Sequence, residues 1–195
     1  MKIHENLLTL GKMNRPGIKL IEMLAVTLHW PEAPNQKPED TRAWFESGKT
    51  YGSTHYIIGT DGKKLQTLPE DEVGYHIGSS QIDPVSKKIY TDKARALMPK
   101  DAFSGKINSQ GYYITPNYYS IGIEMGHLNM FPGDFSEATL NSTAELCADI
   151  LKRYRKTIDI LVTHNEIVGW KDCPRLWVNN PALFFEFKNR VKNLM

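Results

Sequence analysis

Three side chains in this sequence could together bind a soft metal ion. His29 ends the apolar run Leu24–His29, and His164 ends the similar run Ile160–His164, while Cys173 follows nine residues later. Two imidazoles and a thiolate suit Zn²⁺, and three protein ligands leave the fourth tetrahedral position open for water, as in catalytic sites. The spacing alone leaves a second interpretation open. Two unrelated histidines and a buried cysteine could serve only the fold, since no short motif such as His-Glu-x-x-His is present.

Two charged residues lie where they could assist such a metal. Glu124 belongs to the apolar run Tyr119–Met125. A carboxylate directed from a strand toward a metal site is a candidate general base, and a strand carboxylate paired with a lysine is the alternative. Lys171 lies two residues before Cys173. By itself it is typical of a solvated loop lysine, as most lysines are.

The elements that would position these residues are strands and helices mixed along the chain. Apolar runs predict strands over residues 22–29, 54–59, 64–68, 119–125 and 158–163, with a hairpin at Asp61-Gly62. Helices are predicted over residues 38–47 and 136–154, and after an N-cap at Asn180. We therefore expect an α/β fold with one domain over residues 1–195, a central mixed sheet flanked by helices, and the metal site at the sheet edge.

The predicted helices have apolar faces that assign several residues to the core. The first of these faces comprises Leu140, Ala144, Cys147, Leu151 and Tyr154, and the second comprises Leu183, Phe184, Phe187, Val191 and Leu194. Core packing is therefore the expected role of Cys147. Residues 79–118 are expected to form a long, loop-rich insertion with a short helix over 92–98. The insertion carries four tyrosines, Tyr90, Tyr112, Tyr113 and Tyr118, which could stack on a ligand or be half-buried loop residues.

Composition excludes several classes of protein. The 24 Lys and Arg residues against 22 Asp and Glu residues give a net charge of +2 and no basic footprint for nucleic acid. Two cysteines cannot form a disulfide scaffold. No apolar window approaches the roughly 20 residues of a membrane span, and the first residues lack the features of a signal peptide. We expect synthesis in the cytoplasm and binding to neither nucleic acid nor membrane, and the oligomeric state stays open.

Several motifs occur in an order that resembles one enzyme family. They are Asn14-Arg-Pro-Gly17, His29 after its apolar strand, Thr54-His-Tyr-Ile-Ile58, Gly74-Tyr-His-Ile-Gly78, Ser120-Ile-Gly-Ile-Glu-Met125, and His164 with Lys171-Asp-Cys-Pro174. Together they resemble the zinc-dependent N-acetylmuramoyl-L-alanine amidases of phage-lysin type, to which peptidoglycan recognition proteins are related. The resemblance covers residues 14–193.

The resemblance implies one catalytic Zn²⁺ held by His29, His164 and Cys173. It implies that Glu124 is the general base or orients the water, and that Lys171 stabilises the oxyanion at the scissile carbonyl. His76 would contact the substrate, which is bacterial peptidoglycan. The bond cut would be the amide between N-acetylmuramic acid and L-alanine. Some phage members have a catalytic tyrosine where this chain has Thr54, so this chain would depend on Glu124.

Three alternatives stay open at this stage. The first is a peptidoglycan-binding module without activity, against which the intact set of Glu124, Lys171 and Cys173 argues. The second is a metal-free cysteine hydrolase that uses Cys173 and His164, which leaves His29 unexplained. The third is a cytosolic wall-recycling amidase, but those enzymes tend to carry Asp at the position of Cys173. We therefore favour a lysin that reaches the cell wall after release from the cytoplasm.

Overall fold

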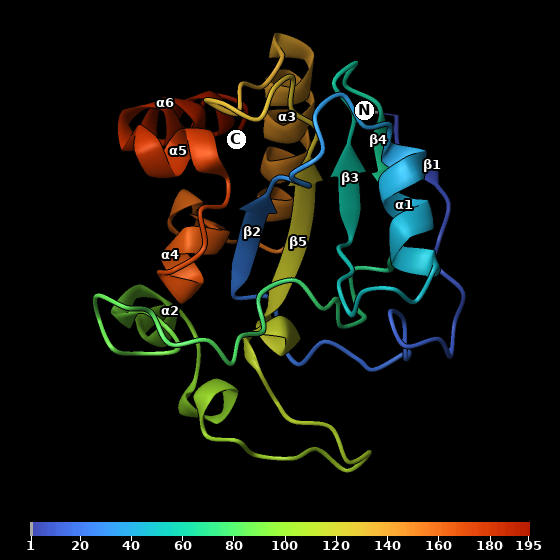
Figure 1. The fold of residues 1–195 in the computed structure, drawn as a ribbon, viewed down its shortest axis with the longest axis vertical. Helices are drawn as coiled ribbons and strands as arrows, with labels where there is room; N and C mark the ends of the chain where they lie inside the picture. Colours follow the sequence, from blue (N-terminus) through green and yellow to red (C-terminus); the bar gives the residue numbers. More distant parts are fainter. Residues whose placement is uncertain (1) are drawn as a thin grey trace.

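The computed structural model describes residues 2–195 and has the α/β fold expected from the sequence (Figure 1). Its six-stranded sheet has the order β1-β4-β3-β5-β2-β6. The strands are β1 (His4–Glu5), β2 (Ala25–His29), β3 (Tyr56–Ile58), β4 (Lys64–Gln66), β5 (Ser120–Met125) and β6 (Leu161–Thr163). Strands β3 and β4 form the expected antiparallel hairpin, and the other neighbouring strands are parallel. The sheet is therefore mixed.

Six α-helices and three short 3₁₀ segments surround this sheet in residues 2–195. The α-helices are α1 (Pro38–Glu46), α2 (Asp92–Leu97), α3 (Glu137–Arg153), α4 (His164–Val168), α5 (Arg175–Asn179) and α6 (Pro181–Lys192). The 3₁₀ segments are Lys100–Phe103, Pro116–Tyr119 and Ile158–Ile160. None of these helices is long and apolar enough to cross a membrane.

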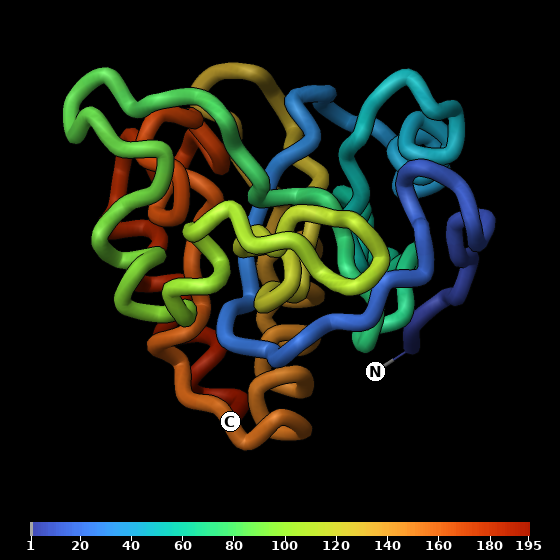
Figure 2. Tube along the Cα trace, turned by 90° about the horizontal axis from the view of Figure 1, so that it is seen from below, coloured from blue at the N-terminus to red at the C-terminus, as the bar shows by residue number. Residues whose placement is uncertain are grey.

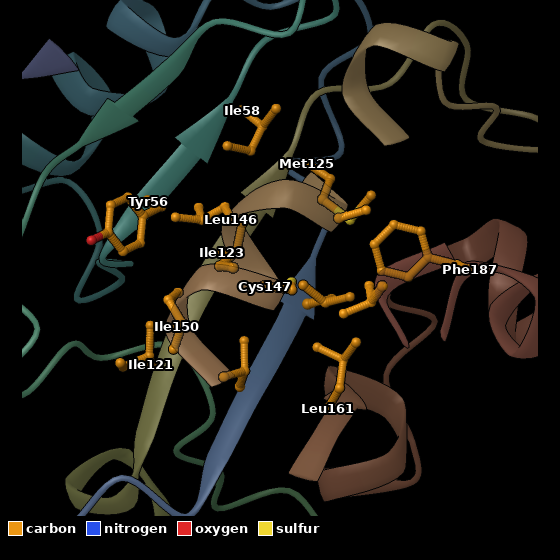
Figure 3. Packing of buried hydrophobic residues seen from close by; sticks show 14 of the residues in the cluster. Tyr56, Ile58, Ile121, Ile123, Met125, Leu146, Cys147, Ile150, Leu161 and Phe187 are labelled. Carbon is orange, nitrogen blue, oxygen red and sulfur yellow. The ribbon is translucent and has the colours of Figure 1, made fainter. Parts of the chain in front are cut away.

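Helix α3 covers one face of the sheet and forms the main core with it (Figure 3). The helix begins where the Ser136 side chain accepts a hydrogen bond from the backbone of Thr139, and Lys152 and Arg153 lie in its last turn. The N-cap stabilises the start of the helix, and the two positive charges stabilise its end. Cys147 is fully buried among Ile123, Leu146 and the other residues of this core, as the sequence predicted.

The period-two alternation of the central strands separates the core from the site. In β2, Val26 and Leu28 belong to the core beneath α3, and in β5 Ile121 and Ile123 do the same. The residues between them point to the opposite face, where the Thr27 hydroxyl lies 2.8 Å from the Ser120 hydroxyl. The register of the two strands pairs His29 with Glu124 on this opposite face.

The insertion at residues 79–118 covers only part of this opposite face. Tyr90 and Tyr118 of the insertion belong to a second buried cluster with Val162 of β6 and Ile167 of α4. Figures 1 and 2 show the insertion gathered at the ends where β2 and β5 begin, away from the carboxyl ends of these strands. The predicted short helix is confirmed as α2, with Thr91 as its N-cap.

Details of the sequence predictions differ at element ends. Residues 158–160 form a 3₁₀ turn, so the strand that precedes His164 is only Leu161–Thr163. The side chain of Asn180 makes no capping hydrogen bond, although Pro181 does begin α6. Leu194 was expected on the inner face of this helix but is 43% exposed, because α6 ends at Lys192 and the chain turns away.

Candidate active site

The three predicted metal ligands lie together at the carboxyl ends of β2 and β6. One ligand atom from each of His29, His164 and Cys173 lies within 4.8 Å of the other two. The Nδ1 atoms of the two histidines are 3.0 Å apart, and the Cys173 Sγ is 3.9 Å from His29 Nδ1. Donor atoms around one tetrahedral zinc ion lie roughly 3.3 to 3.6 Å apart. The residues therefore fit a zinc ion in donor chemistry, and the two distances lie on either side of the spacing that zinc requires.

Local structure fixes the position of each ligand. His29 is the last residue of β2, and His164 is the first residue of α4. A capping box joins Thr163 and Glu166 at the start of this helix. Asn165 then holds the loop that carries Cys173. Its side-chain amide donates to the carbonyls of Gly169 and Lys171, and its backbone N–H donates to the carbonyl of Cys173.

Burial keeps the two histidines in the uncharged form that binds metals. Desolvation and the neighbouring positive charges hold the pKa of His29 and of His164 well below the ordinary value of 6.5. Burial also raises the pKa of the Cys173 thiol, which the Lys171 charge and the Trp30 backbone N–H oppose. A bound metal cation would supply the positive charge that stabilises the Cys173 thiolate. The donor set thus favours a divalent cation.

Two further histidines lie behind the donor set and differ in their roles. His55 Nδ1 accepts from the backbone N–H of Gly122, and its Nε2 donates to the carbonyl of Glu72. The ring therefore ties β5 to the turn at Glu72, which is a structural role. Nδ1 of His76 lies 3.0 Å from Nε2 of His29, and Nε2 of His76 lies 3.2 Å from the carbonyl oxygen of Ser120.

Glu124 combines partial burial with an unused acceptor. Its Oε2 has no hydrogen-bond partner among residues 2–195. Burial raises the pKa of Glu124 from 4.5 to about 7, and the negative charge of Glu32 adds to the rise, whereas the positive charge of Lys171 opposes it. A carboxylate with a pKa near the working pH suits a general base. Since Glu124 pairs with His29 in the sheet register, the carboxylate and the imidazole are held on one rigid surface.

The donor set opens into a cavity of about 970 Å³ on the face of the sheet opposite α3. Glu124, Lys171, Trp30, Trp170 and Tyr112 are among the residues that line it. A second cavity of about 300 Å³ shares Trp30, Phe45, Glu124 and Lys171 with the first. The two cavities therefore adjoin around these four residues, and an elongated ligand can extend in both directions from Glu124 and Lys171.

The motif Asn14-Arg-Pro-Gly17 builds one wall of the larger cavity. The Asn14 side chain donates to the carbonyls of Thr50 and Gly52 at 2.7 Å. Arg15 forms a two-point ion pair with Glu72, with contacts of 2.7 and 3.0 Å. These bonds hold the neighbouring residues Gly11 to Met13 against the cavity.

The insertion contributes one of its four tyrosines to the lining of the cavity. The Asn108 side chain accepts a hydrogen bond from the Tyr112 backbone N–H and donates one to the Tyr118 hydroxyl. The tip of the insertion, which carries Tyr112, is therefore folded on itself. Tyr112 lines the cavity, whereas Tyr113 is 64% exposed outside it. Tyr90 and Tyr118 are buried in the second core.

Sequence reasoning missed Asn165, Trp30 and the hydrogen bonds of His76. Asn165 follows directly after His164, and a polar residue that begins a helix next to a ligand could have drawn attention to it. Trp30 follows His29, and its backbone acts on the Cys173 sulfur. No local signal could have shown the contacts of His76, because its partners lie 47 and 44 residues away.

A family model described as N-acetylmuramoyl-L-alanine amidase matches residues 21–176, which include the three donors, Glu124 and Lys171. The chain belongs to this amidase family. The resemblance inferred from the ordered motifs is thereby confirmed. The match begins after the Asn14–Gly17 motif, so it does not bear on that wall of the cavity.

Similar proteins agree with membership of the amidase family. The N-acetylmuramoyl-L-alanine amidase BlyA of Bacillus subtilis (strain 168) is 29% identical over 95% of this chain and 45% of its own length. The chain spans about half the length of the curated relatives it matches. The catalytic domain of XlyA superimposes with a TM-score of 0.65 at 21% identity, covering 98% of this chain and 99% of that one. The amidase LysC from Clostridium intestinale URNW gives 0.61 at 18%, covering 98% of each. These structures share the fold, which is that of endolysin amidase catalytic domains.

Proposed function

We propose that this chain is a zinc-dependent N-acetylmuramoyl-L-alanine amidase that cleaves bacterial peptidoglycan. It hydrolyses the amide between the lactyl group of N-acetylmuramic acid and the L-alanine of the stem peptide. One observation carries the proposal: Glu124, with a free buried oxygen, is paired in register with the donor His29 and shares a cavity with Lys171. Family membership supplies the class of bond.

Each site residue has a distinct part in this proposal. His29, His164 and Cys173 hold the zinc ion, which when bound acidifies water and polarises the amide carbonyl as a Lewis acid. Glu124 takes the proton from the attacking water and passes it to the leaving amine of L-alanine. The Lys171 ammonium stabilises the negative charge that develops on the carbonyl oxygen. His76, whose ring lines the cavity, contacts the bound peptidoglycan with its carbon edge.

The two cavities support a substrate that extends on both sides of the scissile bond. The bond joins a glycan to a peptide, and the cavities adjoin around Glu124 and Lys171, which would act on it. We propose that residues 1–195 form one catalytic domain, and that residues 79–118 are an insertion that shapes its substrate groove.

The test of activity is the release of new N-terminal L-alanine from purified cell walls with zinc present. We expect release by the wild type and a loss of about 10²- to 10⁴-fold in Glu124→Gln, since a general base contributes that factor. Cell walls that bind the protein but release no L-alanine would support a binding module instead. Activity that survives complete chelation would support a cysteine hydrolase.

The test of the ligands is metal analysis of two matched cysteine variants. Cys173→Ser removes a proposed ligand, and Cys147→Ser replaces the other buried cysteine, which lies in the core beneath α3. We expect stoichiometric zinc in the wild type and in Cys147→Ser, and little in Cys173→Ser. Equal zinc in all three proteins would remove Cys173 from the site.

We further propose that the enzyme acts as a phage or prophage lysin on the assembled wall. The cysteine at position 173 supports this role over wall recycling, in agreement with the endolysin fold of its structural neighbours. We expect intact sacculi to be cleaved at rates comparable to soluble wall fragments. Cleavage of small fragments alone would identify a recycling enzyme.

A further inference from the structure

His76 is held more closely than contact with a substrate requires. The side-chain oxygen of Asn117 accepts from the backbone N–H groups of His76 and Ile77, at 3.0 and 2.8 Å. The ring itself lies on the backbone of Gly122, where any side chain would meet it at 2.7 Å. It stands perpendicular to the His29 ring, with the ring centroids 5.1 Å apart. The protein therefore fixes the position and the orientation of this imidazole.

The partners of the two ring nitrogens determine where the protons lie. Ser120 presents a carbonyl, which only accepts, so His76 Nε2 carries a proton and donates to it at 3.2 Å. In a neutral His76, Nδ1 then has a lone pair and accepts from His29 Nε2 at 3.0 Å. His29 is thus protonated on Nε2, and its Nδ1 lone pair faces His164 Nδ1 and Cys173 Sγ.

The opposite arrangement is unfavourable at this position. A doubly protonated His76 would donate to His29 Nε2 and would place the proton of His29 on Nδ1, between the donor atoms. It would also bury a positive charge under the pocket that contains Lys171, with no carboxylate among its hydrogen-bond partners in residues 2–195. Hydrogen-bond geometry and charge therefore favour the same tautomer.

We propose that His76 is a positioning residue, which holds His29 as the Nε2–H tautomer and directs its Nδ1 lone pair at the metal. This inference rests on the proposed zinc site and deepens it. Metal-binding histidines usually donate their second ring N–H to a carboxylate, a carbonyl or water, and such partners contribute about 10- to 100-fold to metal affinity. Here a second histidine takes that place and passes the hydrogen bond on to the Ser120 carbonyl.

Two substitutions of His76 separate this role from simple packing. His76→Phe keeps a ring of similar size but has no acceptor for His29. His76→Asn loses ring volume but places its side-chain oxygen where Nδ1 stands. We expect zinc affinity, measured by competition with a chromophoric chelator, to fall about 10- to 100-fold in His76→Phe. We expect His76→Asn to stay within about threefold of the wild type. The reverse order of the two variants would overturn the proposal.

Nitrogen NMR of the wild-type protein gives a second test that does not depend on a variant folding. Long-range ¹H–¹⁵N correlations in the histidine rings distinguish protonation on Nε2 from protonation on Nδ1. We expect His29 and His76 both to be protonated on Nε2 in the zinc-loaded protein, and a proton on His76 Nδ1 would overturn the proposal. The failures are distinguishable. A wild type that binds no zinc would remove the metal site itself, whereas equal zinc affinity in wild type and His76→Phe would remove only this role of His76.

Discussion

A single methyl group at Gly122 should weaken zinc binding although it removes no hydrogen-bonding group. An added Cβ at this position would lie 2.7 Å from Cγ and Nδ1 of the His76 ring. Carbon atoms in ordinary contact are about 3.5 to 4.0 Å apart, so the ring must move away by roughly 1 Å. The bond between His76 Nδ1 and His29 Nε2 is 3.0 Å long, and such a shift is enough to break it.

The expected effect of Gly122→Ala is a fall of about 10- to 100-fold in zinc affinity, or about 1.4 to 2.7 kcal/mol. Overpacking itself should destabilise the fold by about 1 to 3 kcal/mol, with or without metal. Thermal unfolding with and without zinc separates the two effects, because only the first reduces the stabilisation that zinc adds. Gly52→Ala is the matched control, since its Cβ would lie in the same cavity with its nearest neighbour at 3.3 Å. Wild-type zinc affinity in Gly122→Ala would refute the role that we assign to the hydrogen bond.

Three other predictions concern the groove and the fold. Tyr112→Ala should raise KM for soluble peptidoglycan fragments by roughly 2- to 10-fold with kcat unchanged, since an aromatic contact contributes about 0.5 to 1.5 kcal/mol. Tyr113 lies outside the cavity, so Tyr113→Ala should leave both constants unchanged. Equal effects of the two substitutions would exclude a specific contact between Tyr112 and the substrate. Glu72→Gln should lower the free energy of unfolding by about 3 kcal/mol in urea titrations, because it leaves the largely buried Arg15 without its negatively charged partner. A loss below 1 kcal/mol would contradict this prediction. Burial alone would raise the pKa of Glu70, but hydrogen bonds from its arginine and tyrosine partners hold it below the ordinary value of 4.5. Its stabilisation is therefore present above pH 4.5 and is lost as the pH falls through the lowered pKa, so acid unfolding of Glu70→Gln should show a shallower pH dependence than that of the wild type.

The donor set was predictable because each part of it follows a local rule. Leu24–His29 and Ile160–His164 are apolar runs that end in histidine, and parallel strands place such ends at one edge of a sheet. The same alternation that buries Ile121 and Ile123 puts Glu124 on the opposite face. Period-two patterning therefore predicts the face of the sheet, provided that the register is correct.

The supporting residues were not predictable because their partners are distant in the sequence or depend on backbone turns. The position of His76 depends on Asn117, near the end of the insertion, and on Gly122 of β5. The bonds of Asn165 require the loop after α4 to return to the start of its own helix. The site residues themselves were reached without any of these contacts, and they stay predictions until the variants are measured.

The proposed catalytic residues and the walls of the cavity come from different parts of the chain, and these parts can change separately. The proposed base and the first proposed metal ligand stand on adjacent strands, where a one-residue deletion in either strand would turn the side chain of that strand into the core. The cavity walls come instead from the segment around Lys12 and from the tip that carries Tyr112, and loops of this kind tolerate insertions and deletions. Exchange of these two segments between relatives would therefore test whether they set substrate selectivity. The sheet that carries the proposed base and ligand would be left intact.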